Sequence, residues 1–594
     1  MAATLLFYIR HDCLNVHAEK QKETPGNGLC FCLCLGYHGH CEQLPHPAQF
    51  LRDINHCNKD AAMYDLVIEN ALIVDGTGAK PVSGGLAVKG DRIEAMGPEI
   101  NAAVQAAKRH DAKGQVVAPA FIDVHSHSDA QFLENDRTEA KLLQGIGTEI
   151  TGQCGISVVP NADETLEFRL PYFKAQFSER FCNTMDFKAL RSIKDYARMS
   201  GETKHTINTA LLIGHGALRT AVMGFSGESP TAAQQERMEK ILDESIADGA
   251  WGLSLGLAYS PGNFSKLPEL AGLARVVARQ GATVHVHMRN ESVGVFDSVR
   301  EMIDVARESG AHVHISHLKL MGKAQWGRAP ELIAMLEKAR AEGLKITADQ
   351  YPYTGSSTGL IVLVPKWALE GGIAAFLKRL RSPERERVTA GITQEMDSRG
   401  GPNAVMISTN GLFPEYDFRR MDELAAKENL PPGEMAANIL EKAEGNARAI
   451  YFSMDMNDVL HIMRSDFVGV GSDGYAFNFD EAKGAHHPRN FGTFPRFIRT
   501  VLDEKVMSLE KAVWKTTGLA AETMGLKQRG VLAPGNMADI VIFDPERIRD
   551  KATFDNAFQK PVGIAAVIVA GQITAANNEL TGARAGKLLL RRQK

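Results

Sequence analysis

Between residues 118 and 527, short apolar strand patterns alternate with helical patterns, and this alternation limits the possible folds more than any other feature of the chain. A helix is predicted to begin after Thr231, at a capping-box pattern, and another has Pro330 in its first turn. Eight segments read as strands: Val116–Val124, Thr148–Gln153, Ile207–Gly214, Gly252–Leu257, Thr283–His287, His312–His317, Lys345–Tyr351 and Phe467–Gly471. Eight strands with intervening helices predict an α/β fold, a (β/α)8 TIM barrel.

Further segments surround or interrupt this barrel. Short β patterns in residues 63–117 and 528–585 predict a small β-sandwich formed from both ends of the chain. A charged, helix-prone stretch at about 366–452 predicts an inserted subdomain between strands seven and eight. Residues 1–62 hold six of the eight cysteines, but their spacing matches no zinc pattern. We expect a poorly ordered extension there, which an early start codon would explain.

Composition narrows the range of partners and compartments. The formal net charge of −4 over 594 residues gives no electrostatic reason to expect nucleic acid or an anionic membrane as a partner. No apolar stretch is long enough to cross a bilayer, and the first residues lack the basic region of a signal peptide. After residue 60 the only cysteines are Cys154 and Cys182. This usage favours a reducing cytoplasm, and the oligomeric state is left open.

A His-x-His pair, His125 and His127, stands at the end of the first strand pattern. Residues two apart in a strand share a face, so we expect both rings to point the same way as Asp123 and Asp129. Two neighbouring imidazoles can hold one metal ion, although such a pair alone is weak evidence. Other strand ends must supply further ligands.

Polar residues do follow the other strands, where the active site of such a barrel lies. The candidate ligands and acid–base group are His125, His127, Cys154, His287, His317 and Asp473. Imidazole, thiolate and carboxylate are the ligands that Zn²⁺ prefers. Taken alone, Cys154 could equally be a small buried hydrophobic residue. Asp473 follows a buried strand, where an unpaired carboxylate is costly, so a metal-linked or base role is favoured.

The remaining histidines of these strands are given other roles. His285 lies one layer deeper than His287 and is expected to face the core or support the ligands. His312 and His314 have the opposite parity to His317, which predicts that they face the helices and are structural. His215 could serve either purpose.

From Tyr64 to about Gly571 the chain resembles the amidohydrolase superfamily, and within it the N-acyl-D-amino-acid deacylase (D-aminoacylase) family. The resemblance lies in a set of motifs: Asp-Val-His-Ser-His-Ser-Asp (123–129), Gly-Gln-Cys-Gly (152–155), His-Met-Arg-Asn-Glu (287–291), Ile-Ser-His-Leu-Lys (315–319), Tyr-Pro-Tyr-Thr-Gly-Ser-Ser (351–357), Gly-Ser-Asp-Gly (471–474) and His-Pro-Arg (487–489). Two departures are Ala120, where the family's first strand has glycine, and a longer segment between Asp473 and Arg489.

The resemblance implies one tight zinc held by Cys154, His287 and His317, and a second, weaker site at which His125 and His127 share the thiolate. Hydantoinases and dihydroorotases instead bridge two metals with a carboxylated lysine on strand four, and strand four here has no lysine.

The expected reaction is zinc-dependent hydrolysis of N-acyl-D-amino acids, with Asp473 as base and then acid. Arg489 and Lys319 are expected to bind the substrate carboxylate. By resemblance, Tyr259, Tyr351 and Ser357 also contact the substrate. The D configuration follows from the resemblance alone, and the side-chain class is left open. The alternatives are hydrolysis of a cyclic amide and a catalytically silent scaffold.

Overall fold

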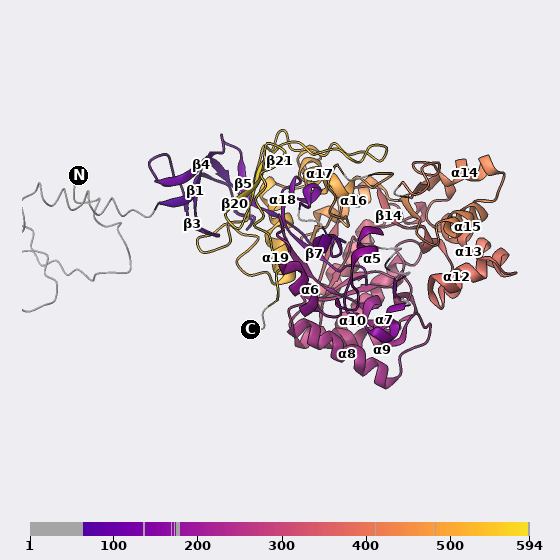
Figure 1. The fold of residues 1–594 in the computed structure, drawn as a ribbon. Coiled ribbons are helices and arrows are strands. Elements are labelled where there is room, and N and C mark those ends of the chain that lie inside the picture. Colours follow the sequence, from indigo (N-terminus) through magenta and orange to yellow (C-terminus); the bar gives the residue numbers. More distant parts are fainter. Residues whose placement is uncertain are drawn as a thin grey trace, which may run out of the picture. The chain divides into compact units, whose positions relative to one another are not determined.

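The computed structural model describes residues 63–134, 137–167, 169–170, 173, 179–409, 411–480 and 483–591. The predicted Cys-rich extension, residues 1–62, lies outside these ranges. Within the described part, a barrel of parallel strands adjoins a small β-sandwich and an inserted subdomain (Figure 1). The predicted fold class is confirmed.

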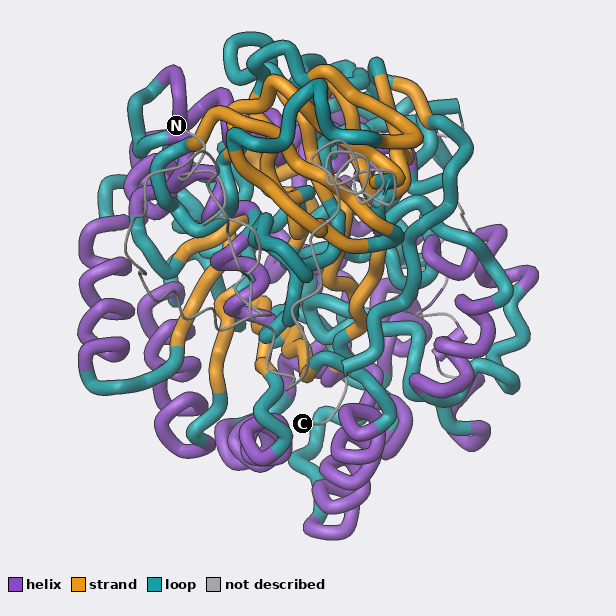
Figure 2. The backbone as a smooth tube through the Cα atoms, turned by 90° about the vertical axis from the view of Figure 1, so that its left-hand side faces the viewer, coloured by secondary structure: helices purple, strands orange, loops and turns teal. Residues whose placement is uncertain are grey.

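The β-sandwich combines strands from both ends of the chain, hydrogen-bonded in one nine-stranded sheet at the top of the view in Figure 2. Its order is β21-β20-β19-β18-β5-β1-β2-β3, and β4 pairs with β1. The strands are β1 (Tyr64–Ile73), β2 (Val82–Lys89), β3 (Arg92–Gly97), β4 (Ala106–Asp111), β5 (Val116–Pro119), β18 (Ile540–Phe543), β19 (Ile564–Val569), β20 (Gln572–Ala576) and β21 (Glu579–Leu580). Leu66, Ile68 and Ile540 belong to its buried core.

The barrel consists of parallel strands in the order β6-β7-β8/β9-β10-β11-β12-β13-β17, where β8 and β9 are two segments of the third strand. Their bounds are β6 (Phe121–Asp123), β7 (Ile146–Thr151), β8 (Asn208–Leu211), β9 (Ile213–Gly214), β10 (Gly252–Gly256), β11 (Thr283–His287), β12 (His312–Ile315), β13 (Ile346–Gln350) and β17 (Val468–Val470). A bridge between Ser126 and Gly474 joins the ends of the first and last strands. All carboxyl ends therefore meet at one mouth.

The first barrel strand is shorter than the sequence predicted. The apolar run Val116–Val124 predicted one buried strand, but the chain divides at Ala120 into β5 and β6. β5 pairs with β1 and β18 in the sandwich, and β6 pairs with β7 in the barrel. The prediction of one strand is wrong, because an unbroken apolar run does not show where a chain passes from one sheet to another.

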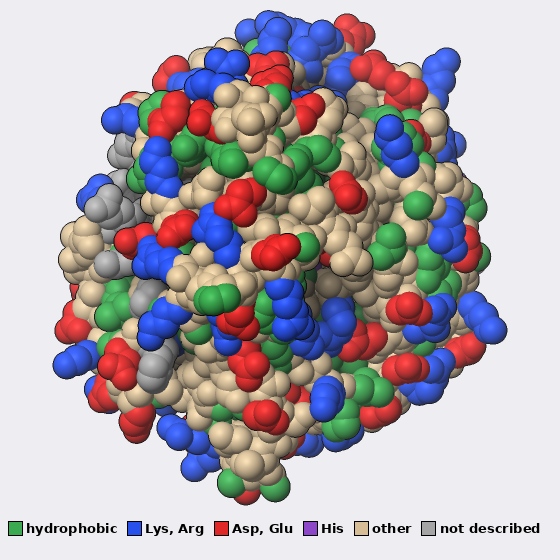
Figure 3. Space-filling view, turned by 90° about the vertical axis from the view of Figure 1, so that its right-hand side faces the viewer, with side chains coloured by type: hydrophobic (Ala, Val, Ile, Leu, Met, Phe, Trp, Pro, Cys, Tyr) green, Lys and Arg blue, Asp and Glu red, His purple; other side chains and the backbone are tan. Residues whose placement is uncertain are grey.

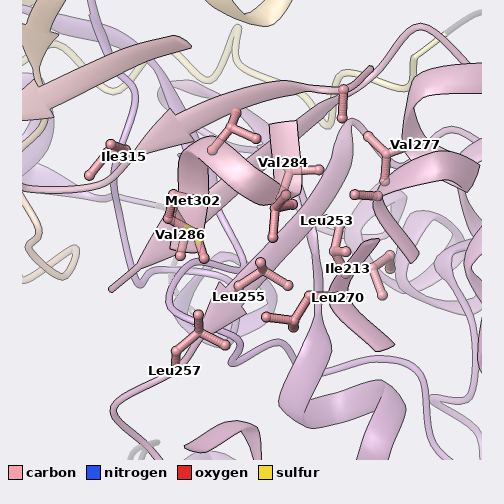
Figure 4. Packing of buried hydrophobic residues seen from close by; sticks show 14 of the residues in the cluster. Ile213, Leu253, Leu255, Leu257, Leu270, Val277, Val284, Val286, Met302 and Ile315 are labelled. Carbon is pink, nitrogen blue, oxygen red and sulfur yellow. The ribbon is translucent and has the colours of Figure 1, made fainter. Parts of the chain in front are cut away.

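Helices cover the barrel, and their caps follow from the sequence. Thr231 and Gln234 form the expected capping box of α8, and Pro330 stands in the first turn of α11. Apolar side chains such as Leu253 and Val284 fill the space between strands and helices (Figure 4). The helices are α2 (Gln131–Glu134), α3 (Glu139–Leu142), α5 (Glu179–Thr184), α6 (Ile193–Gly201), α7 (His215–Met223), α8 (Ala232–Ala247), α9 (Leu267–Arg279), α10 (Val295–Ser309), α11 (Ala329–Ala341), α16 (Met456–Arg464), α17 (Arg489–Asp503), α18 (Leu509–Thr516) and α19 (Gly518–Met524).

The inserted subdomain, 355–452, connects strands β13 and β17 by way of α16. Its elements are β14 (Gly355–Gly359), α12 (Gly372–Leu380), α13 (Arg385–Ser398), β15 (Val405–Ser408), α14 (Met421–Glu428), α15 (Pro432–Lys442) and β16 (Arg448–Phe452). It has an antiparallel sheet of order β14-β16-β15, and its buried apolar side chains, such as Phe376 and Ile407, form one hydrophobic cluster with Tyr351 and Tyr353 outside it. The sequence predicted the helices but not this sheet, and the subdomain begins earlier than the expected residue 366.

Among the helices of the described ranges, none has the length and apolar character needed to cross a membrane.

Candidate metal centre and active site

The two histidines of the His-x-His pair lie in a turn directly after β6. His127 N donates to Gly474 O at 2.9 Å, and Asp473 N donates to His125 O at 2.8 Å. These backbone bonds hold the ends of the first and last strands together. The predicted shared face does not extend to Asp129, whose carboxylate accepts from Val158 N at 2.9 Å, because the strand ends at Asp123.

Cys154 lies at the centre of the barrel mouth. Its Sγ is 3.4 Å from His125 Nε2, 3.6 Å from His287 Nδ1 and 3.6 Å from His317 Nε2. Two groups of side chains could each hold a metal ion, because within each group the possible ligand atoms all lie within 4.8 Å of one another. The first group is His125, His127, Cys154 and Asp473, and the second is Cys154, His287 and His317. The thiol is common to both groups. The structure thus brings every predicted metal-site residue together.

Three of these side chains extend from turns with a left-handed backbone. The φ angles are 54° at Cys154, 38° at His317 and 51° at Asp473. Residues other than glycine rarely adopt this conformation, and such strained residues cluster at functional sites. Each of the three turns directs a polar side chain into the mouth after its strand has ended.

Asp473 joins the histidine pair to a buried cation. Its Oδ1 is 3.0 Å from His127 Nε2, and its Oδ2 is 2.8 Å from the Arg489 guanidinium. Burial alone would raise the pKa of this carboxyl, but Arg489 and then His127 hold it well below its usual value. The group is therefore a charged carboxylate at neutral pH, able to accept a proton.

The donor set fits a metal cation. Burial lowers the pKa of His127 to about 4 and that of His287 well below its usual value, so both rings are neutral with a lone pair available. Burial, and then the Asp473 carboxylate, raises the pKa of the Cys154 thiol well above its usual value. A divalent cation beside the sulfur would offset both causes and favour the thiolate.

Two carboxylates that the sequence reasoning missed support the histidines from behind. On β13, Asp349 accepts from His317 N at 2.8 Å and lies 3.4 Å from His125 Nδ1. Glu291 Oε1 lies 2.9 Å from His317 Nδ1 and 2.7 Å from Lys319 Nζ. Carboxylates in such positions fix the ring orientation of metal-binding histidines. Glu291 ends the motif His-Met-Arg-Asn-Glu (287–291), which by itself indicates no role for the carboxylate, whereas the alternation of side chains along β13 indicates that Asp349 faces the barrel interior.

Three further histidines of the barrel belong to neither group of possible metal ligands, and the structure places one of them differently from the prediction. His285 lies deeper in the barrel, as expected, and its ring is 4.5 Å from that of His314. His314 Nε2 is 2.9 Å from Asp349, so the prediction that His314 faces the helices is wrong. The prediction assumed that side chains alternate between the two faces of one strand as far as His317. It failed because β12 ends at Ile315, and the turn at His317, with its left-handed backbone, breaks this alternation. His215 pairs with Glu269 at 2.7 Å, in neither metal group.

A buried lysine connects the strand ends beneath the histidine pair. Lys141 on α3 is inaccessible to solvent; its Nζ donates to Asp123 at 2.7 Å and to Ser472 Oγ at 2.8 Å. Glu149 lies 3.8 Å from the same ammonium. This network fixes the turn that carries Asp473 against the end of β6.

A pocket lies above the two groups of possible metal ligands and extends to residues of the inserted subdomain. The predicted substrate-binding residues all line it: Lys319, Arg489, Tyr259, Tyr351 and Ser357. The Ser357 carbonyl accepts from Arg489 at 2.9 Å, and the Tyr259 hydroxyl lies 2.8 Å from Thr358 Oγ1. Figure 3 shows the face that carries the insertion, with Lys and Arg side chains beside a hollow near its middle.

Comparison with known proteins supplies independent findings. Residues 109–575 match the model of the Amidohydrolase family. The chain is 35% identical to the N-acyl-D-glutamate deacylase of Alcaligenes xylosoxydans xylosoxydans over 85% of this chain and 93% of that protein. It is 33% identical to the D-aminoacylase of the same organism, over 90% and 99%. The crystal structure of the Bordetella bronchiseptica N-acyl-D-glutamate deacylase, complexed with zinc and a phosphonate mimic of the tetrahedral intermediate, is 32% identical. It superposes with a TM-score of 0.73, covering 89% of this chain and 100% of the other.

Proposed function

The chain belongs to the amidohydrolase family, and we propose that it is a metal-dependent deacylase that hydrolyses N-acyl-D-amino acids to a carboxylate and a free D-amino acid. The observation that carries this proposal is the Cys154 thiol shared between two groups of ligands, with the Asp473 carboxylate beside them. The complete donor set argues against a catalytically silent scaffold. Strand β10 has no lysine that could bridge two metals, which argues against a cyclic-amide hydrolase.

Zinc is the ion that suits these donors. Cys154, His287 and His317 would hold it tightly, and His125 and His127 would form a weaker second site that shares the thiolate. When bound, the ion supplies a Lewis acid and lowers the pKa of water towards about 7.

Asp473 carries out the proton transfers. Its charged carboxylate accepts a proton from the attacking water and returns that proton to the leaving nitrogen. Arg489 keeps the carboxylate charged and oriented, because its guanidinium contacts both Asp473 and the Ser357 carbonyl. Because its nitrogen is protonated in this step, the leaving group departs as a neutral amine and not as an amide anion.

The cations of the pocket wall bind the substrate α-carboxylate. Arg489 has further N–H donors beyond those used inside the protein, and the Lys319 ammonium has donors beyond the one directed at Glu291. Tyr259, Tyr351 and Ser357 line the same pocket and complete the contacts to the substrate. A cytoplasmic location stays a prediction from cysteine usage.

The direct test is amino-acid release from matched N-acetyl-D and N-acetyl-L substrates, with and without a metal chelator. The panel comprises methionine, leucine, phenylalanine, glutamate and aspartate. We expect turnover of D substrates only, abolished by the chelator and restored by zinc. Turnover of L substrates, or none on either enantiomer with metal bound, would contradict the proposal.

A further inference from the structure

One of the cations that line the pocket differs from the others in its partners. Four basic side chains line it: Lys319, Arg399, Arg448 and Arg489. Three are paired with carboxylates: Lys319 with Glu291 at 2.7 Å, Arg399 with Glu395 at 2.9 Å and Arg489 with Asp473 at 2.8 Å. Arg448 has no carboxylate within 4 Å among the residues that the structure describes.

Arg448 is held in place by an uncharged partner. It is the first residue of β16, and one of its terminal nitrogens lies 3.3 Å from the Tyr475 hydroxyl. Its guanidinium carbon lies 5.4 Å from the centre of the Tyr475 ring. A phenol orients the guanidinium but does not neutralise it. A half-buried cation beside other cations favours the arrival of an anion.

The position of Arg448 suits the far end of a substrate. The Tyr475 ring is 5.5 Å from the ring of His127, so Tyr475 adjoins both a proposed metal ligand and Arg448. Arg489, in contrast, contacts Asp473 directly. Arg489 thus contacts a proposed reacting group directly, whereas Arg448 contacts Tyr475, so the two cations are suited to two separate carboxylates.

We propose that Arg448 binds a second carboxylate of the substrate, so that the pocket favours N-acyl-D-amino acids carrying two carboxylates. This inference rests on the proposed function for the reaction and names its substrate class. The second carboxylate can belong to the amino-acid side chain, as in glutamate or aspartate, or to the acyl group. Both sources offer the bidentate geometry that a guanidinium binds best.

The test compares two dianions with matched monoanions, which lack the second carboxylate, on the full, zinc-loaded chain. N-acetyl-D-glutamate is paired with N-acetyl-D-glutamine, and N-succinyl-D-leucine with N-butanoyl-D-leucine. We expect the protein to prefer one dianion by about 10- to 100-fold in kcat/KM, the range for a charge-assisted pair. Arg448→Met removes this preference and changes turnover of the matched monoanion by less than about threefold. Arg448→Lys retains part of it, since charge without the planar fork remains.

Arg399→Met is the matched control, since Arg399 lines the same pocket but already has a carboxylate partner. We expect this variant to keep the preference. If Arg448→Met loses the preference in the glutamate pair, the second carboxylate belongs to the amino-acid side chain. If it loses the preference in the succinyl pair, the carboxylate belongs to the acyl group.

Two results separate this inference from the proposed function. If the protein cleaves the monoanionic D compounds without preferring either dianion, or if Arg448→Met keeps the preference, the role of Arg448 is overturned and the deacylase function stands. If none of the four D compounds is cleaved, the proposed function fails and this inference fails with it.

Discussion

The barrel mouth and the inserted subdomain border the same pocket, but they hold their side chains differently. At the mouth, buried carboxylates support the proposed metal ligands: Asp349 contacts His125 and His317, and Glu291 contacts His317. The subdomain instead presents Arg448, with only a phenol as its partner. With the proposed roles of Asp473 and Arg448, the barrel would provide the chemistry and the subdomain would select the substrate. Substitutions in the barrel should therefore affect every substrate, and those in the subdomain only some.

The largest expected effect in the barrel comes from the shared thiol. Cys154→Ala removes a donor from both groups of ligands, so we expect loss of the tight metal and a fall in kcat/KM of more than about 10⁴-fold for all substrates. Metal analysis of the purified protein, together with activity, measures this. Cys182→Ala, at the other described cysteine, should keep both. A Cys154→Ala protein with full metal and near-normal activity would place the chemistry elsewhere.

Substitution of Asp473, the proposed proton-transfer group, should have the next largest effect. Asp473→Asn keeps the shape of the side chain but not its basicity, so we expect kcat to fall by about 10²- to 10⁴-fold. Steady-state kinetics over a panel of substrates should show the same factor for each. Asp480→Asn, on the same segment but paired with Arg137 at the surface, is the control and should have no effect. If kcat fell for only some of the substrates, Asp473 would contribute to substrate selection and not to proton transfer.

The buried lysine tests whether the mouth depends on its supports. Lys141→Met leaves Asp123 and Glu149 without their cation, which should lower the free energy of unfolding by about 3–5 kcal/mol. Denaturant unfolding measures the change, and we also expect lower kcat for all substrates. Lys560→Met breaks a partly exposed pair with Glu139 and should cost less than about 1 kcal/mol. Equal losses in the two variants would argue against a special role for this network.

The smallest expected effect lies at the junction of the two regions. Thr358 on β14 contacts the Tyr259 hydroxyl of the barrel side at 2.8 Å. Thr358→Val removes one neutral hydrogen bond, worth about 1 kcal/mol, so kcat/KM should fall about fivefold with the metal content unchanged. Thr358→Ser should restore the value. A change of 100-fold or more, or loss of metal, would show that the subdomain takes part in the chemistry.

How much the sequence could predict differs between these regions. Strand and helix periodicity predicted the barrel, and the polar residues after its strands predicted the metal groups. The alternation of side chains along a strand failed to predict His314, because β12 ends at Ile315 and His317 has a left-handed backbone, and it failed for Asp129, because β6 ends at Asp123. The division at Ala120 and the sheet of the subdomain depend on pairings between distant segments, which local patterns do not contain. Arg448 could be singled out only once the carboxylate partners of its neighbours were known.

The measurement that tests the central claim most directly is X-ray absorption at the zinc edge of the loaded protein. If the barrel builds its chemistry around the Cys154 thiolate, the spectrum will show a sulfur ligand at about 2.3 Å beside nitrogen or oxygen ligands at about 2.0 Å. The sulfur ligand should be absent from Cys154→Ala reconstituted with zinc and unchanged in Arg448→Met. Tightly bound zinc with only nitrogen and oxygen ligands in the unaltered protein would contradict the account.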